Sequence, residues 1–402
     1  MTTPSAPVVP DAVVPGAVVP DLPWSLAQGQ PEAVAQLQRA VEQTSSLAHA
    51  WLITGPPGSG RSTLATAFAA ALIADPAEEA TARENTLRQV LSGTHPDVTI
   101  LRTEQVIIRI DEARRLVERA YFSPSLGRYR VIVVEDADRM AERTSNVLLK
   151  ALEEPPERTV WILCAPSDAD LLPTIRSRVR VLRLREPEVA DVARLIASRT
   201  GVSEARAEQA ARLAQRHIGM AQRLATDADA MNRREQALDA ALRVRGVGDA
   251  IEVAARIVQV ATEDAKAITA ERDEAERAGL RNTLGLAEGA SVPASARSQL
   301  SALEEAQKRR ATRSLRDGID RALTDMQSLY RDVLMLQLVG DRDLINQERE
   351  GDLRALADGW TSQRTLEVLD HLASLRRDLE QNVAPTLALE SLLITVAHGR
   401  TP

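Results

Sequence analysis

The stretch "GPPGSGRST" over residues 55–63 differs by one residue from a loop that binds nucleotide phosphates. That loop follows the pattern G-x-x-x-x-G-K-[ST], in which backbone N–H groups cradle phosphate and the lysine reaches the β and γ phosphates. Here Arg61 replaces the lysine, so the same charge sits on a longer, planar and forked side chain. Whether nucleotide binds therefore stays open. The candidate phosphate-contacting residues are Gly55, Pro57, Gly58, Gly60, Arg61, Ser62 and Thr63.

An acidic pair ends the apolar run of "VIVVEDADRM" over 131–140. This layout is typical of the Walker B motif, whose acids hold Mg²⁺ and orient the attacking water. The order here is Glu135–Asp136, the reverse of the usual Asp–Glu, so each carboxylate is displaced by one methylene. A misplacement of about 1 Å can lower a rate ~10²-fold. The inverted pair and Arg61 together predict that the chain does not hydrolyse ATP independently.

A third stretch, "LLPTIRSRVR" over 171–180, contains Ser177 and Arg178. By themselves, its alternating arginines would predict a strand with a charged face. Its position after a predicted strand, in a chain that also has the two motifs above, favours a functional role instead.

Short apolar runs alternate with helical patterns from residue 31 to residue 184, which predicts a parallel α/β sheet. The first run leads directly into the glycine-rich loop, and a buried helix is expected over 64–74. Strands are predicted over 49–54, 97–102, 129–135, 159–165 and 179–184, and helices over 31–43, 109–120 and 145–154. After Pro187 the patterns are helical only.

Composition restricts the class of protein. The chain has 402 residues, a net charge of −7 and a single cysteine, Cys164, so we expect no internal disulfide and a cytoplasmic protein. No apolar run is long enough to predict a membrane span. The one dense basic run, "QKRRATRSLR" over 307–316, is interpreted as a solvated helix face, so any contact with DNA is expected to need partners. The Val-Val-Pro repeats within residues 1–23 predict a disordered tail.

Several stretches together resemble the AAA+ core of bacterial clamp-loader subunits. They are "LAHAWLITGPPGSGRS" (47–62), "GTHPD" (93–97), "GRYRVIVVEDADRM" (127–140), "NVLLKALEEPPERTVWIL" (146–163) and "LLPTIRSR" (171–178). The helical region with "LYRDVLMLQLVG" (329–340) is similar to the collar of these subunits. The resemblance implies an α/β AAA+ core over 24–186, a small helical lid over 187–229 and an all-α collar over 230–402 that serves oligomerisation. A flexible segment is expected near 279–295.

The altered site is most similar to that of the clamp-loader stator, an AAA+ module that does not hydrolyse ATP. The resemblance implies that Arg178, with Ser177 beside it, acts as an arginine finger in trans at the ATP site of a neighbouring gamma/tau subunit. It also implies a heteropentamer with gamma/tau and delta subunits of DNA polymerase III, which loads the sliding clamp on primed DNA. Ser167 and Arg223 fall at sensor-like positions.

Members of this family usually carry a four-cysteine zinc module between Leu72 and Gly93. This chain has no cysteine there, so we expect a helix in its place and no zinc. No cofactor is expected to be required, and ATP or ADP with Mg²⁺ stays possible.

Two alternatives stay open. One is a gamma/tau-like motor that hydrolyses ATP at its own P-loop. The other is an unrelated AAA+ remodeller that assembles as a homohexamer. The first predicts ATPase activity that depends on this chain's own P-loop, and the second predicts a homo-oligomer.

Overall fold

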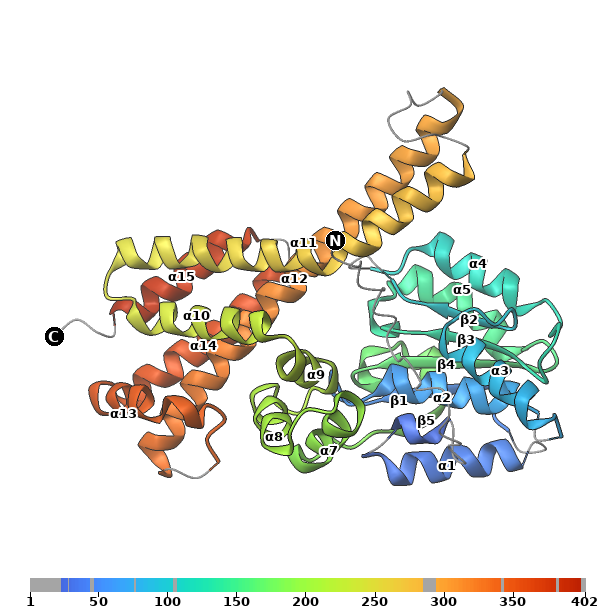
Figure 1. The fold of residues 1–402 in the computed structure, drawn as a ribbon, viewed down its shortest axis with the longest axis horizontal. Coiled ribbons are helices and arrows are strands. Elements are labelled where there is room, and N and C mark those ends of the chain that lie inside the picture. The colour runs from blue at the N-terminus through green and yellow to red at the C-terminus, as the bar shows by residue number, and fades with distance from the viewer. Residues whose placement is uncertain are drawn as a thin grey trace, which may run out of the picture.

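The computed structural model describes residues 23–27, 29–43, 47–75, 77–103, 107–284, 294–340, 343–380 and 383–398. They form an α/β core, a small group of short helices and a larger helical region, which follow one another along the chain (Figure 1). This arrangement confirms the expected fold class. The predicted N-terminal tail lies outside the described residues, except for Pro23.

The core is built on one sheet of five parallel strands in the order β2-β3-β4-β1-β5. All five strands form where the apolar runs predicted them. β1, β3 and β4 are buried along their whole length, as expected for parallel strands that are covered on both faces. β5 lies at one edge. The bounds are β1 Ala50–Thr54, β2 Val98–Leu101, β3 Arg130–Val134, β4 Thr159–Ala165 and β5 Arg180–Arg183.

Helices cover both faces of this sheet. One apolar cluster joins one face to α1 (Pro31–Glu42), α2 (Arg61–Ile73) and α3 (Ala80–Leu91). A second cluster joins the opposite face to α4 (Ile110–Ala120), α5 (Glu142–Glu153) and the short α6 (Pro173–Arg176). α3 occupies the stretch in which a helix was expected instead of a zinc module.

The second module, which we call the lid, contains α7 (Val189–Thr200), α8 (Glu204–Leu213) and α9 (Ile218–Thr226). Its small core consists largely of alanine and aliphatic side chains, so the three helices pack closely.

The third module, the collar, begins at α10 (Ala228–Arg243). Its core includes Tyr330 and Trp360, whose rings stack with centroids 5.7 Å apart. The remaining helices are α11 (Val247–Thr283), α12 (Ala294–Leu338), α13 (Glu350–Gly359), α14 (Ser362–Glu380) and α15 (Pro385–His398). α11 and α12 run side by side and extend beyond the collar as a paired arm (Figure 1).

The expected flexible segment near 279–295 is wrong at its start, because α11 continues through Thr283. Ala294 already begins α12, and residues 285–293 lie outside the described residues. Leu280 O accepts a hydrogen bond from Leu284 N at 3.0 Å, so helical bonding extends to the end of this described segment. Within the described chain, none of the helices has the length and apolar content needed to cross a membrane.

Candidate functional site

The glycine-rich loop connects β1 to α2, in the strand–loop–helix context that its motif requires. Gly58 and Gly60 have φ angles of +79° and +91°, a conformation that glycine adopts without steric cost. Ser59 N donates to Pro56 O at 3.1 Å, which closes the loop, and α2 begins at Arg61. The loop therefore has its expected course, with Ser62 and Thr63 on the first turn of α2.

The lid is seated on this loop. Ile218 N, at the start of α9, donates to Gly58 O at 3.2 Å. The side chain of His217 lies so close to Gly58 that a Cβ atom there would come within 2.3 Å of the His217 ring. Burial, with the charges of Arg321 and Arg61 nearby, lowers the pKa of His217, so the ring is neutral at pH 7. Gly58 is thus fixed by packing as well as by φ.

The loop has polar atoms that suit a phosphate group. Nη1 of Arg61 and Oγ of Ser59 are buried, and neither has a hydrogen-bond partner within the described residues. Buried polar atoms are normally satisfied, and the N-terminus of α2 adds positive potential at the same place. These donors fit the phosphates of a nucleotide.

The acids at the end of β3 do not present a comparable fit for Mg²⁺, because arginines engage both of them. Glu135 pairs with Arg102 at 2.9 Å. Asp136 pairs with Arg313 of α12 at 3.1 Å and with Arg139 at 3.8 Å. Arg313 lies 177 residues further along the chain, so the collar reaches the Walker B-like position of the core.

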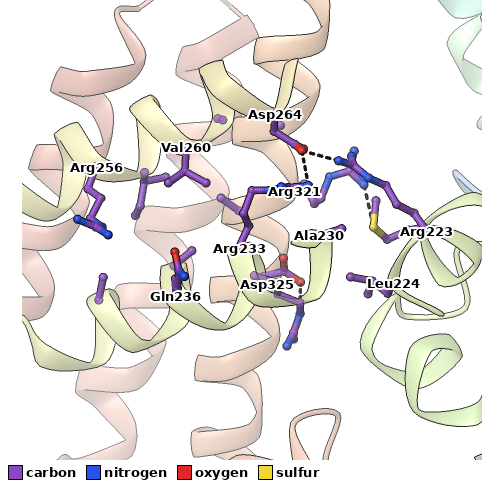
Figure 2. Close-up of a pocket in the computed structure, with 18 residues that line it drawn as sticks. Arg223, Leu224, Ala230, Arg233, Gln236, Arg256, Val260, Asp264, Arg321 and Asp325 are labelled. Carbon is purple, nitrogen blue, oxygen red and sulfur yellow. Dashed lines mark hydrogen bonds and ion pairs between the residues drawn. The ribbon is translucent and has the colours of Figure 1, made fainter. Parts of the chain in front are cut away.

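The two sensor-like residues have partners of their own. Ser167 caps a short helix, where its Oγ accepts a hydrogen bond from Ala169 N at 3.2 Å. Arg223 points into a pocket between α9, α10, α11 and α12, and its Nη2 lies 2.5 Å from Asp264 (Figure 2). In this conformation Arg223 is committed to the joint between lid and collar, and its sensor role stays a prediction.

Ser177 and Arg178 lie between α6 and β5, at the edge of the sheet. Their segment turns out of a short helix, so the alternative interpretation of 171–180 as one charged strand is wrong. Arg178 Nη1 donates to Thr174 O at 2.6 Å and to Ser177 Oγ at 3.0 Å. Its Nη2 lies 2.5 Å from Glu153 Oε1, in the "LEEPP" stretch at the end of α5. Two of the motifs quoted above thus meet at this edge.

Comparison with known proteins identifies the family. Residues 29–188 match the family model described as "DNA polymerase III, delta subunit", and residues 297–398 match "DNA polymerase III, delta subunit, C terminal". The chain is 41% identical over 135 residues to DNA polymerase III subunit delta′ of Pseudomonas aeruginosa, which covers 33% of this chain and 41% of that protein. The chain belongs to the clamp-loader family of DNA polymerase III subunits.

Among clamp-loader proteins, this chain resembles delta prime, but gamma/tau subunits are also similar to it in sequence. It is 31% identical over 163 residues to the gamma/tau subunit of Mycobacterium bovis, a match that covers 39% of this chain and 28% of that protein. A gamma subunit-related protein from Thermotoga maritima has a similar structure, with a TM-score of 0.48, 18% identity and coverage of 91% of this chain and 99% of that one. The chain thus spans less than half the length of these curated relatives.

Three residues of this site make contacts that the amino-acid sequence does not predict. His217 lies within the predicted lid and Glu153 within the stretch 146–163 that resembles the family, but the sequence predicts no contact for either side chain. Arg313 belongs to the basic run that was interpreted as a solvated face. That interpretation holds for Lys308 and Arg309 but is wrong for Arg313, which reaches Asp136.

Proposed function

We propose that this clamp-loader subunit is a stator of the delta prime type, which does not hydrolyse ATP itself. In this role it joins gamma/tau and delta subunits and helps to load the ring-shaped sliding clamp on primed DNA. The observation that carries the proposal is the pairing of Asp136 with Arg313, together with that of Glu135 with Arg102.

Arginines occupy the acids Glu135 and Asp136. Phosphoryl transfer needs carboxylates that hold Mg²⁺ and orient the nucleophile, since catalysis consists mainly of positioning and charge stabilisation. An arginine on Asp136 competes with a metal ion for the same oxygens. Arg61 adds a second departure from the catalytic pattern, because its forked guanidinium cannot act as the compact charge of lysine. The loop can still hold phosphate, so we propose nucleotide binding without turnover as the most that this site does.

The second part of the proposal is an arginine finger in trans. Arg178 lies beside the edge strand β5, and its side chain is 33% exposed, so a neighbouring subunit can approach it. A guanidinium at a neighbour's ATP neutralises charge that develops on the transferred phosphoryl group. In this way the chain contributes one residue to catalysis at a site that it does not contain.

A stator should hold its modules in a fixed arrangement, and three ion pairs between modules support that role. Arg212 of α8 lies 2.6 Å from Glu348 of the collar, and Arg223 of α9 lies 2.5 Å from Asp264 of α11. Arg313 connects the collar to the core. Although each ion pair is weak alone, together they restrict hinge motion between lid and collar and between collar and core.

The direct test is ATP hydrolysis by the purified chain. We expect no turnover above background, with or without Mg²⁺, and the same result for Ser62→Ala. A rate of order 1 per second that Ser62→Ala abolishes would fall within the range of working enzymes and would favour the gamma/tau-like motor instead. Binding of a fluorescent ATP analogue, measured in the same samples, reports separately whether the loop holds nucleotide.

A further inference from the structure

The guanidinium of Arg178 is held by two kinds of acceptor. Thr174 O and Ser177 Oγ are neutral, come from the same short segment and accept from Nη1. Glu153 Oε1 is charged, comes from the end of α5 and lies 2.5 Å from Nη2. The neutral acceptors orient the side chain, whereas the carboxylate also cancels its charge.

This difference matters when a phosphate approaches. A carboxylate and a phosphate on one guanidinium repel each other over a short distance, and repulsion is stronger where water is excluded. The contacts of Thr174 and Ser177 carry no such penalty. An arginine has five N–H donors, so with these two contacts kept, Nε and Nη2 can serve as a planar fork for phosphate oxygens.

We propose that Glu153 is a latch on Arg178, which keeps the guanidinium neutralised until the phosphate of a neighbouring subunit displaces the carboxylate. The latch rests on the proposed function of Arg178 as a finger. Ser177 and Thr174 then act as positioning groups that stay in contact after Glu153 has left.

The geometry allows this exchange. Glu153 is the last residue of α5, and its side chain is 46% exposed, so its carboxylate can turn into solvent without disturbing the core. Ion pairs of such exposure are weak, and a multiply charged phosphate outcompetes a single carboxylate for the guanidinium. Until then, Arg178 is paired within its own chain.

The test uses a reconstituted loader whose gamma/tau subunits lack arginine fingers of their own. In this loader, Arg178 supplies the only arginine finger. Glu153→Gln keeps the size of the side chain and removes its charge. Glu154→Gln is the matched control, because it removes the same charge one residue away, from an exposed side chain that forms no ion pair with Arg178 within the described chain. We expect Glu153→Gln to raise ATP hydrolysis without DNA and clamp about two- to fivefold, the range that release of a weak ion pair allows. Glu154→Gln should leave the rate unchanged.

Two further variants separate the latch from the finger. If Arg178→Ala leaves the rate of this loader unchanged, the proposed finger is wrong and the latch with it. If Arg178→Ala lowers the rate but Glu153→Gln lowers it too, or matches Glu154→Gln, the finger stands and the latch is wrong. The double variant Glu153→Gln with Arg178→Ala should equal Arg178→Ala alone, since Glu153 acts only through Arg178. Any additional change in the double variant contradicts the proposal.

Discussion

Nη2 of Arg313, on collar helix α12, lies 3.1 Å from Oδ2 of Asp136, at the Walker B-like position of the core. Both side chains are about a quarter exposed, so the pair is partly shielded from solvent. Asp136 itself has a φ angle of +53°, so its backbone is held in a conformation that is uncommon for residues other than glycine. The contact joins the Walker B-like acids, which arginines occupy, to the part of the chain that is expected to bind other subunits.

Replacing Arg313 should loosen the joint between core and collar. We expect Arg313→Ala to lower the free energy of unfolding by about 1 kcal/mol, the upper end of the range for solvent-exposed ion pairs, because this pair is partly shielded. Hydrogen exchange should rise in residues 137–139, which follow Asp136. Arg309→Ala is the control, because Arg309 pairs only with Glu305 on the same helix surface within the described residues. Equal hydrogen exchange of residues 137–139 in the two variants would contradict the claim that Arg313 holds the collar to the core.

The seat of the lid on the P-loop can be tested at Gly58. A Cβ at this position would overlap His217, including its backbone Cα at 2.6 Å, so Gly58→Ala must displace the lid. Gly93→Ala is a matched control, since Gly93 has a similar φ of +71° but nothing within 4 Å of the added atom. We expect Gly58→Ala to be less stable than Gly93→Ala by about 1–3 kcal/mol, as for other overpacked sites. Urea unfolding measures the difference, and equal stabilities would mean that the lid does not rest on the loop.

The strands and the P-loop could be predicted because their signals are local. Each buried strand is a short apolar run, and the loop is fixed by its own glycines and by the strand and helix that flank it. The contacts that cover the P-loop and occupy the acids could not be predicted in this way. His217 and Arg313 are far from Gly58 and Asp136 in sequence, and no periodic pattern reports which loop a histidine will cover.

The basic run over 307–316 shows the same limit. On α12, Lys308 and Arg309 are exposed to solvent, whereas Arg310 is buried and pairs with Asp273 and Glu276 of α11. Arginine is common in this chain, so its presence alone does not distinguish a solvated position from a paired one. The choice depends on which acids the packing of two long helices brings within reach.

Asp97, in the "GTHPD" stretch, should make stability depend on pH below about 4, near the ordinary carboxyl value. Burial alone would raise the pKa of Asp97, but hydrogen bonds from the N–H groups of Gly127, Ser125 and Leu126 outweigh it and hold the pKa below its usual range. A carboxyl whose pKa is depressed in the folded state stabilises the fold above its unfolded pKa, and this contribution is lost as pH falls through the folded pKa.

Asp97→Asn should therefore lower stability at pH 7 by about 3–5 kcal/mol, since it also leaves the buried Arg130 without its charged partner. The difference from wild type should shrink as pH is lowered below about 4. Asp111→Asn, at an exposed ion pair, is the control and should show a small difference at every pH. Denaturant unfolding between pH 3 and 7 gives both curves, and a constant difference for Asp97→Asn would contradict the assignment.

The most direct test of the account is a complete loader that carries Arg178→Ala in this chain alone, assayed for clamp- and DNA-stimulated ATP hydrolysis and for clamp loading. An arginine finger raises the rate ~10³–10⁵-fold at the ATP site that it serves. Hydrolysis at the one site that Arg178 serves should therefore nearly stop, and the total ATPase rate of the loader should fall in part. Arg178→Lys should restore little, because lysine lacks the planar fork. Since Arg178 pairs with the half-exposed Glu153, the variant should assemble normally and lose less than about 1 kcal/mol of stability. Wild-type rates of hydrolysis and loading in an intact complex would contradict the central claim.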